Sequence, residues 1–281
     1  DIEIEYGGKS YKFIVTTPPE YNSYDGKYPA VLYFPGWGCI TDANPYANNA
    51  IQYPYLSTNS GSPISITSKR GTLYNTYSDV YKKYKKFVWI SLNLTADLEH
   101  EFYANGTSEN LKIVGVITAL KMKWIPKLKI DQTKMFAAGQ SIGGQLLKYL
   151  IPTGVLSEFT KIAIFSGGSM NQTVKAKFWY YNDHSNLKFS ESYLKYWYDK
   201  FLQNNTIKVV TFTPTDDEVY AYDDLKEFET YVNSKGSFCN VINCGTGNHP
   251  AGWEGPMDNL QRYAIEPGKN NISYLEWFLS E

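Results

Sequence analysis

A serine between two glycines is the sharpest chemical signal in this sequence. Residues 139–143 read Gly-Gln-Ser-Ile-Gly, between a short apolar run at 134–138 and a segment of helical periodicity at 142–150. Glycines on either side let a strand and a helix approach closely across a strained turn, which raises the serine hydroxyl above the sheet. The N–H of the following residue then faces the oxygen on which charge develops during acyl transfer. We predict Ser141 as a nucleophile and Ile142 as one oxyanion donor.

A nucleophilic serine needs a general base, and chain order favours one histidine. In the fold that carries such a turn, the acid and then the histidine follow the serine. His100 precedes Ser141, and no acid at the end of a strand separates His184 from Ser141. His249 lies in the glycine-rich loop 245–250, just after the last predicted strand. We therefore predict His249 as the base.

Two neighbouring carboxylates compete for the third position. Asp216 and Asp217 follow the predicted strand 207–213. The acid accepts a hydrogen bond from Nδ1–H of the imidazole, which fixes the tautomer that leaves Nε2 free to take the serine proton. We predict Asp216 for this role, with Asp217 as the alternative. The other carboxylate and Glu218 would be solvated or would cap the next helix.

The second oxyanion donor is expected in the loop after the third predicted strand. Residues 34–39 read Phe-Pro-Gly-Trp-Gly-Cys, and glycines there let backbone N–H groups face a substrate oxygen. We predict the N–H of Trp37 as this donor. The same loop and the histidine loop would meet at one edge of the sheet, which favours a disulfide between Cys39 and Cys244. A bridge between Cys239 and Cys244 is not expected, because the two stand about 16 Å apart along one strand. Three free thiols are the alternative.

Apolar strands alternating with amphipathic segments predict the scaffold. Strands are expected at 2–6, 10–17, 30–34, 87–92, 134–138, 162–165, 207–213 and 238–242. Helices are expected at 108–123, where Leu111, Val114, Ile117 and Leu120 would share one side, at 142–150 and at 222–233. This order predicts one α/β domain over 1–281, with a mostly parallel sheet covered on both faces. A loop at 42–71 and an aromatic-rich insertion after Ser166 interrupt the alternation.

Composition excludes several classes of function. Hydrophobic residues make up 43% and charged residues 20% of the 281 positions, as in ordinary globular proteins. No apolar run is long enough to span a membrane. A net charge of −1 gives no electrostatic case for a nucleic acid or anionic lipid partner. Histidine and cysteine spacing matches no zinc site, and no nucleotide-binding loop is present, so we expect neither metal nor cofactor.

Two features suggest a chain that is secreted and glycosylated. The sequence begins at Asp1 without an initiator methionine, as a processed chain would. Asn-x-Ser/Thr acceptors occur at Asn93, Asn105, Asn171, Asn204 and Asn271.

With these motifs placed, the chain resembles the feruloyl and acetylxylan esterases of the first carbohydrate-esterase family and the related polyhydroxybutyrate-depolymerase-like esterases, which have the α/β-hydrolase fold. The similar segments are Lys-Tyr-Pro-Ala-Val-Leu-Tyr-Phe-Pro-Gly at 27–36, Ala-Ala-Gly-Gln-Ser-Ile-Gly-Gly at 137–144, Phe-Ser-Gly-Gly at 165–168 and Gly-Asn-His-Pro-Ala-Gly-Trp at 247–253. The resemblance covers most of the chain in order, except the region 42–71 and the insertion after Ser166. Pro35 stands where the family usually has the histidine of a His-Gly pair before the oxyanion residue.

The resemblance implies a metal-independent hydrolase of ester-linked ferulate or acetate on plant cell-wall xylan. The expected substrate is therefore esterified xylan or a hydroxycinnamoyl-oligosaccharide. The 25 Tyr, 14 Phe and 7 Trp include candidates for an aromatic acyl slot, and we predict Trp253, Trp179 and Tyr180 as substrate-binding residues. Acetylxylan hydrolysis is the alternative specificity. A non-catalytic carbohydrate-binding module with a hydrolase-like fold is the alternative from another class.

Overall fold

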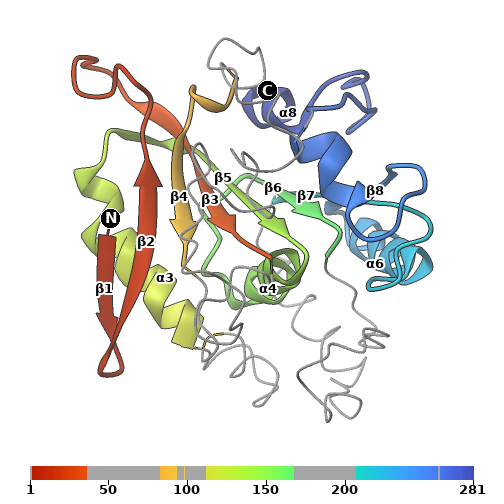
Figure 1. Cartoon of the computed structure of the whole chain (residues 1–281), viewed down its shortest axis with the longest axis horizontal. Coiled ribbons are helices and arrows are strands. Elements are labelled where there is room, and N and C mark those ends of the chain that lie inside the picture. Colours follow the sequence, from red (N-terminus) through yellow and green to blue (C-terminus); the bar gives the residue numbers. More distant parts are fainter. Residues whose placement is uncertain (1, 37–82, 94–97, 99–111, 168–206, 259) are drawn as a thin grey trace.

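The computed structural model contains a mixed sheet of eight strands (Figure 1). The structure describes residues 2–36, 83–93, 98, 112–167, 207–258 and 260–281. The strands lie in the order β1-β2-β4-β3-β5-β6-β7-β8. Their bounds are β1 Ile2–Tyr6, β2 Lys9–Thr16, β3 Tyr28–Phe34, β4 Val88–Leu92, β5 Ile130–Gln140, β6 Lys161–Phe165, β7 Lys208–Thr213 and β8 Phe238–Asn243. β2 pairs antiparallel with β1 and with β4, and every later pairing is parallel.

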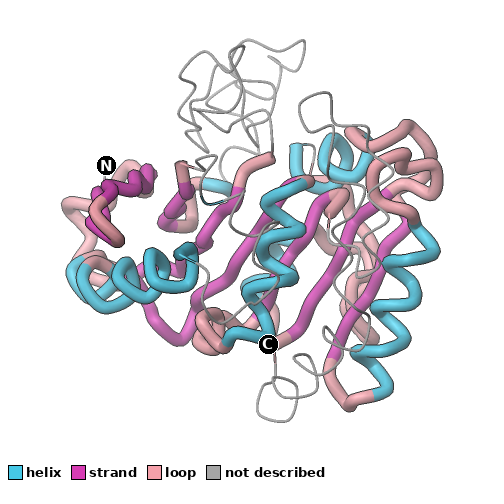
Figure 2. Tube along the Cα trace, turned by 90° about the horizontal axis from the view of Figure 1, so that it is seen from below, coloured by secondary structure: helices cyan, strands magenta, loops and turns pink. Residues whose placement is uncertain are grey.

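Helices cover the sheet and follow individual strands. Figure 2 shows them in cyan around the magenta strands. The α-helices are α3 Lys112–Lys123, α4 Ile142–Leu150, α6 Tyr222–Ser234, α7 Ala251–Trp253 and α8 Tyr274–Leu279; shorter helical turns are η4 Ile125–Lys127, η5 Ile151–Thr153 and η7 Glu254–Asp258. Within the part of the chain that the structure describes, no helix is both long and apolar enough to cross a membrane.

Two hydrophobic clusters lie on opposite faces of the sheet. Successive side chains of a strand point to opposite faces, and β3 divides in this way: Ala30 and Leu32 belong to one cluster, Val31 and Tyr33 to the other. Helices α3, α4 and α6 contribute to the first cluster and α8 to the second. Every residue of the inner strands β4 and β6 is buried. The predicted mostly parallel sheet covered on both faces is therefore correct.

The apolar face of α3 agrees in part with the prediction. Described from Lys112, the helix buries Ile113, Val116, Ile117 and Leu120, an i, i+3, i+4, i+7 pattern that keeps one face toward the core. Ile117 and Leu120 were predicted, and the predicted Val114 is half-buried against the same cluster. Leu111 lies outside the described residues. The loop 42–71 and nearly all of the insertion after Ser166 lie outside the described residues.

Candidate active site

Ser141 occupies the turn between β5, which ends at Gln140, and α4, which begins at Ile142. Its backbone has φ 51° and ψ −118°, a conformation that non-glycine residues rarely adopt and that costs on the order of 1–3 kcal/mol. The Ser141 N–H donates to the carbonyl oxygen of Phe165 at 2.8 Å, which fixes the turn to β6. The hydrogen bond to β6 thus holds the backbone of Ser141 in its strained conformation.

The glycines of this turn are required for close packing. A Cβ at Gly143 would lie 2.2 Å from the carbonyl oxygen of Phe34, and one at Gly139 would lie 2.7 Å from the Gly143 backbone. Both separations are far below a van der Waals contact. Only glycine therefore lets β3, β5 and α4 meet at this point, as the pattern of the sequence predicted.

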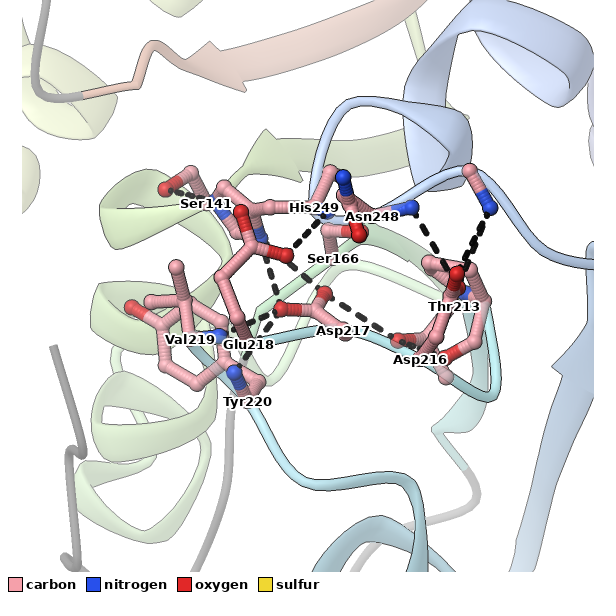
Figure 3. Close-up of polar contacts among 12 residues, drawn as sticks. Ser141, Ser166, Thr213, Asp216, Asp217, Glu218, Val219, Tyr220, Asn248 and His249 are labelled. Carbon is pink, nitrogen blue, oxygen red and sulfur yellow. Dashed lines mark hydrogen bonds and ion pairs between the residues drawn. The ribbon is translucent and has the colours of Figure 1, made fainter.

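The imidazole of His249 lies between Ser141 and Asp217 (Figure 3). Ser141 Oγ is 2.8 Å from His249 Nε2, and His249 Nδ1 is 3.0 Å from each carboxylate oxygen of Asp217. Because Asp217 accepts a hydrogen bond from Nδ1–H, Nε2 is free to accept the serine proton. The predicted nucleophile and base are brought together.

The favoured acid, Asp216, was the wrong one of the pair. Its carboxylate turns outward and accepts from the backbone N–H groups of Gly247 at 3.1 Å and Asn248 at 3.2 Å. Asp217 turns inward because its Oδ1 also accepts from the N–H groups of Val219 at 2.8 Å and Tyr220 at 2.9 Å, which fold the chain back around it. The alternative residue therefore faces the histidine.

Asp217 stays ionised in this environment. Burial of its side chain, which has no exposed area, raises its pKa. Hydrogen bonds from His249 and from the backbone N–H groups of Tyr220 and Val219 outweigh burial, so the pKa lies below the usual range for an aspartate. A permanent negative charge behind the imidazole stabilises the imidazolium that proton transfer from Ser141 would create.

Comparisons with known proteins agree with this arrangement at the level of the fold. No known sequence family and no curated protein matches the chain. Among solved structures, Pyrococcus horikoshii acylaminoacyl peptidase is similar with a TM-score of 0.59 and 9% identity, over 92% of this chain and 38% of that one. An acylaminoacyl peptidase in complex with Z-Gly-Gly-Phe-chloromethyl ketone gives 0.58 and 10%, over 88% and 37%. The apo form of Thermogutta terrifontis esterase 2 gives 0.52 and 15%, over 91% and 85%.

The chain has the α/β-hydrolase fold. It spans well under half the length of the peptidases that it matches. In α/β-hydrolases the nucleophile sits on a strand-to-helix elbow, and the acid and the histidine follow it in the chain. Ser141 after β5, Asp217 after β7 and His249 after β8 have this order.

Two residues that sequence reasoning did not assign to the site hold the backbone of His249. Glu218, expected to be solvated or to cap a helix, accepts from the His249 N–H, and Ser166 donates its hydroxyl proton to the His249 carbonyl oxygen. Ser166 stood in the Phe-Ser-Gly-Gly segment that carried part of the family resemblance. Its place at the end of a buried strand was the one available signal.

Aromatic rings flank the imidazole. Trp253 packs edge-on against His249, with ring centroids 4.9 Å apart and an interplanar angle of 86°. Tyr220 lies on another side, with a centroid separation of 5.6 Å. Trp253, which was predicted to bind substrate, thus lies against the His249 ring. The other two predicted substrate-binding residues, Trp179 and Tyr180, lie outside the described residues.

The oxyanion site is described in part. Ile142 is the first residue of α4, and N–H groups in the first turn of a helix have no partner within it. A Cβ at Gly36 would lie 3.6 Å from Ser141 Cβ, so the loop after β3 passes beside the nucleophile, as predicted. Trp37 itself lies outside the described residues.

The thiols and carboxylates of the described ranges form no metal site. No group of three or more His, Cys, Asp and Glu side chains there could hold an ion. Cys239 and Cys244 are free cysteines, and burial raises the pKa of each thiol to about 12, which keeps both protonated. Because Cys244 is a free thiol, the predicted disulfide with Cys39, which lies outside the described residues, is not formed in this structure.

Proposed function

We propose that the chain is a serine hydrolase that cleaves carboxylic esters through an acyl-enzyme. The observation that carries the proposal is the unbroken contact from Ser141 Oγ through the His249 imidazole to a buried, ionised Asp217. Each atom in this series has the hydrogen-bonding role that proton transfer from a serine requires. A binding module has no use for such an arrangement on a strained backbone.

The reaction proceeds in two halves. Ser141 attacks the ester carbonyl while His249 Nε2 takes the hydroxyl proton, and the N–H groups of Ile142 and Trp37 stabilise the oxyanion. His249 then protonates the departing alcohol. In the second half His249 removes a proton from water, which attacks the acyl-enzyme. His249 then returns that proton to Ser141 Oγ as the bond to the serine breaks and the acid is released. Asp217 stays ionised throughout and orients the ring.

For the substrate we propose hydroxycinnamoyl esters on plant cell-wall xylan, hydrolysed outside the cell. The support is the sequence resemblance to feruloyl esterases together with the aromatic side chain of Trp253 against the His249 ring. A flat apolar ring beside the reacting centre suits a feruloyl group. Acetylxylan hydrolysis is the alternative, because an acetyl group needs no aromatic slot.

The test compares three proteins on several substrates. Wild type, Ser141→Ala and the exposed-serine control Ser23→Ala are assayed for release of ferulate from methyl ferulate, of acetate from acetylated xylan, and of amine from an N-acylated amino-acid anilide. Ester turnover in wild type and Ser23→Ala, absent in Ser141→Ala, is expected. Turnover of the anilide alone would replace the esterase by a peptidase. Failure of folded wild type on all substrates, with no labelling of Ser141 by a fluorophosphonate, would favour the non-catalytic module.

A further inference from the structure

The backbone of His249 is held on both sides by side chains that take no part in proton transfer. Its N–H donates to Glu218 Oε2 at 3.0 Å, and its carbonyl oxygen accepts from Ser166 Oγ at 2.8 Å (Figure 3). Ser166 follows β6, and Glu218 lies in the turn after β7. The histidine is therefore anchored to two neighbouring strand ends in addition to the contacts of its ring.

The residues before His249 are held in the same way. Oδ1 of Asp216 accepts from the N–H groups of both Gly247 and Asn248. Three consecutive N–H groups, at 247–249, thus bind the two carboxylates that flank Asp217 in the sequence. Asp216 and Glu218 bind the backbone of residues 247–249, while Asp217 between them binds the imidazole ring of His249.

One residue of this loop has a backbone conformation that depends on such contacts. Gly245 and Gly247 take φ values of 93° and 141° without steric cost, but Asn248, with φ 60°, carries a side chain. A non-glycine residue such as Asn248 in the left-handed region persists when surrounding contacts determine its conformation. The carboxylates supply these contacts between β8 and α7.

Ser166 is itself built into the sheet. It is fully buried, has φ 44°, and its N–H donates to the carbonyl oxygen of Phe212 at 2.8 Å. A Cβ at Gly252 would lie 1.9 Å from Ser166 Oγ, so a glycine at 252 is what lets the hydroxyl reach the histidine loop. The hydrogen bond between Ser166 and His249 therefore requires a positive φ at Ser166 and the absence of a side chain at Gly252.

We propose that Glu218, Asp216 and Ser166 are positioning residues, which hold the backbone of His249 so that its imidazole stays aligned between Ser141 and Asp217. The inference rests on the proposed hydrolase function. Loss of an anchor lets the ring drift, and a displacement of about 1 Å can cost on the order of 100-fold in rate. The loss falls on kcat, because substrate contacts are unchanged.

The experiment uses Glu218→Ala, Glu218→Gln and Ser166→Ala, with Glu5→Ala as control. Glu5 is an exposed carboxylate on β1, at the opposite edge of the sheet. Kinetics on a p-nitrophenyl ester are combined with the low-field proton NMR resonance of His249 Nδ1–H, which reports its hydrogen bond to Asp217. We expect kcat to fall about 10- to 100-fold in Glu218→Ala and Ser166→Ala, with KM nearly constant and the resonance shifted or broadened. Glu218→Gln keeps an acceptor oxygen, so it restores kcat and the resonance to near wild type.

Unchanged kcat and an unchanged resonance in both alanine variants would overturn the inference. An equal loss in Glu218→Gln and Glu218→Ala would also overturn it, because the hydrogen bond would then not be what matters. If Ser166→Ala fails to fold, the exposed Glu218 pair carries the test alone. If wild type hydrolyses no ester, the resonance still tests the anchoring, so failure of the proposed function and of this inference are distinguishable.

Discussion

Replacing Asp217 by asparagine tests which carboxylate serves the histidine. Oδ1 of Asp217 accepts from two backbone N–H groups, at Val219 and Tyr220, so the asparagine amide keeps its oxygen on that side. Its NH2 group then replaces Oδ2 at 3.0 Å from His249 Nδ1, where a donor meets a donor. The remaining oxygen, also 3.0 Å from Nδ1, is neutral and shared with the two backbone N–H groups, so it holds the Nδ1 proton less strongly than the carboxylate does. The ring responds by moving its proton to Nε2, and in that tautomer it cannot accept the proton of Ser141.

The expected loss is large and specific. A wrong tautomer with intact geometry costs about 10⁴ in kcat in a serine protease, which corresponds to about 5 kcal/mol of transition-state stabilisation. Asp216→Asn is the matched control, because its amide oxygen still accepts from Gly247 and Asn248. We expect Asp216→Asn to lose less than about 10-fold, since only a charge at an exposed position changes.

The assay is steady-state hydrolysis of p-nitrophenyl acetate at pH 7.5 by wild type and both variants, with circular dichroism melts to confirm folding. KM is expected to stay constant in Asp217→Asn, because the residue does not contact substrate. The reasoning is refuted if Asp217→Asn keeps more than about a tenth of wild-type kcat, or if Asp216→Asn falls as far.

Three further changes act on stability. The pKa of Glu276 is lowered to about 2, because hydrogen bonds at the start of α8 outweigh burial. Its contribution to folding stability is therefore full above the unfolded pKa and is lost as pH falls toward 2. The melting temperature of Glu276→Gln should be below that of wild type at pH 7, and the gap should close toward pH 2. Burial, beside the Phe228 ring, lowers the pKa of Lys148 to about 7. Below that pH the folded state must bury a charged ammonium that the unfolded chain exposes to water, which lowers folding stability. Lys148→Met should therefore be more stable than wild type at pH 6 in urea titrations, by a margin that shrinks toward pH 10. Gly143→Ala should yield little folded protein. Gly36→Ala should fold normally in the same expression trial, because the nearest atoms of the described residues, beyond its chain neighbours, would lie 3.6 Å from its Cβ.

Local steric requirements allowed much of the site to be predicted from the sequence. The elbow at 139–143 needs glycines where the strands and the helix pack closely, so Ser141 was recognisable from its neighbours and from the strand and helix around it. His249 followed from chain order and a glycine-rich loop after the last strand. The strand pattern likewise predicted the sheet, because parallel strands that are buried on both faces contain nearly continuous apolar runs.

Only the tertiary structure decided which of two adjacent carboxylates meets the histidine. Asp216 and Asp217 are chemically identical, and the choice depends on how the turn after β7 rotates to satisfy two of its own N–H groups. The anchoring roles of Glu218 and Ser166 depend on contacts that join β6, β7 and the loop after β8, which are far apart in the chain. Local pattern determines which residue types can react, whereas long-range packing sets the direction in which each side chain points.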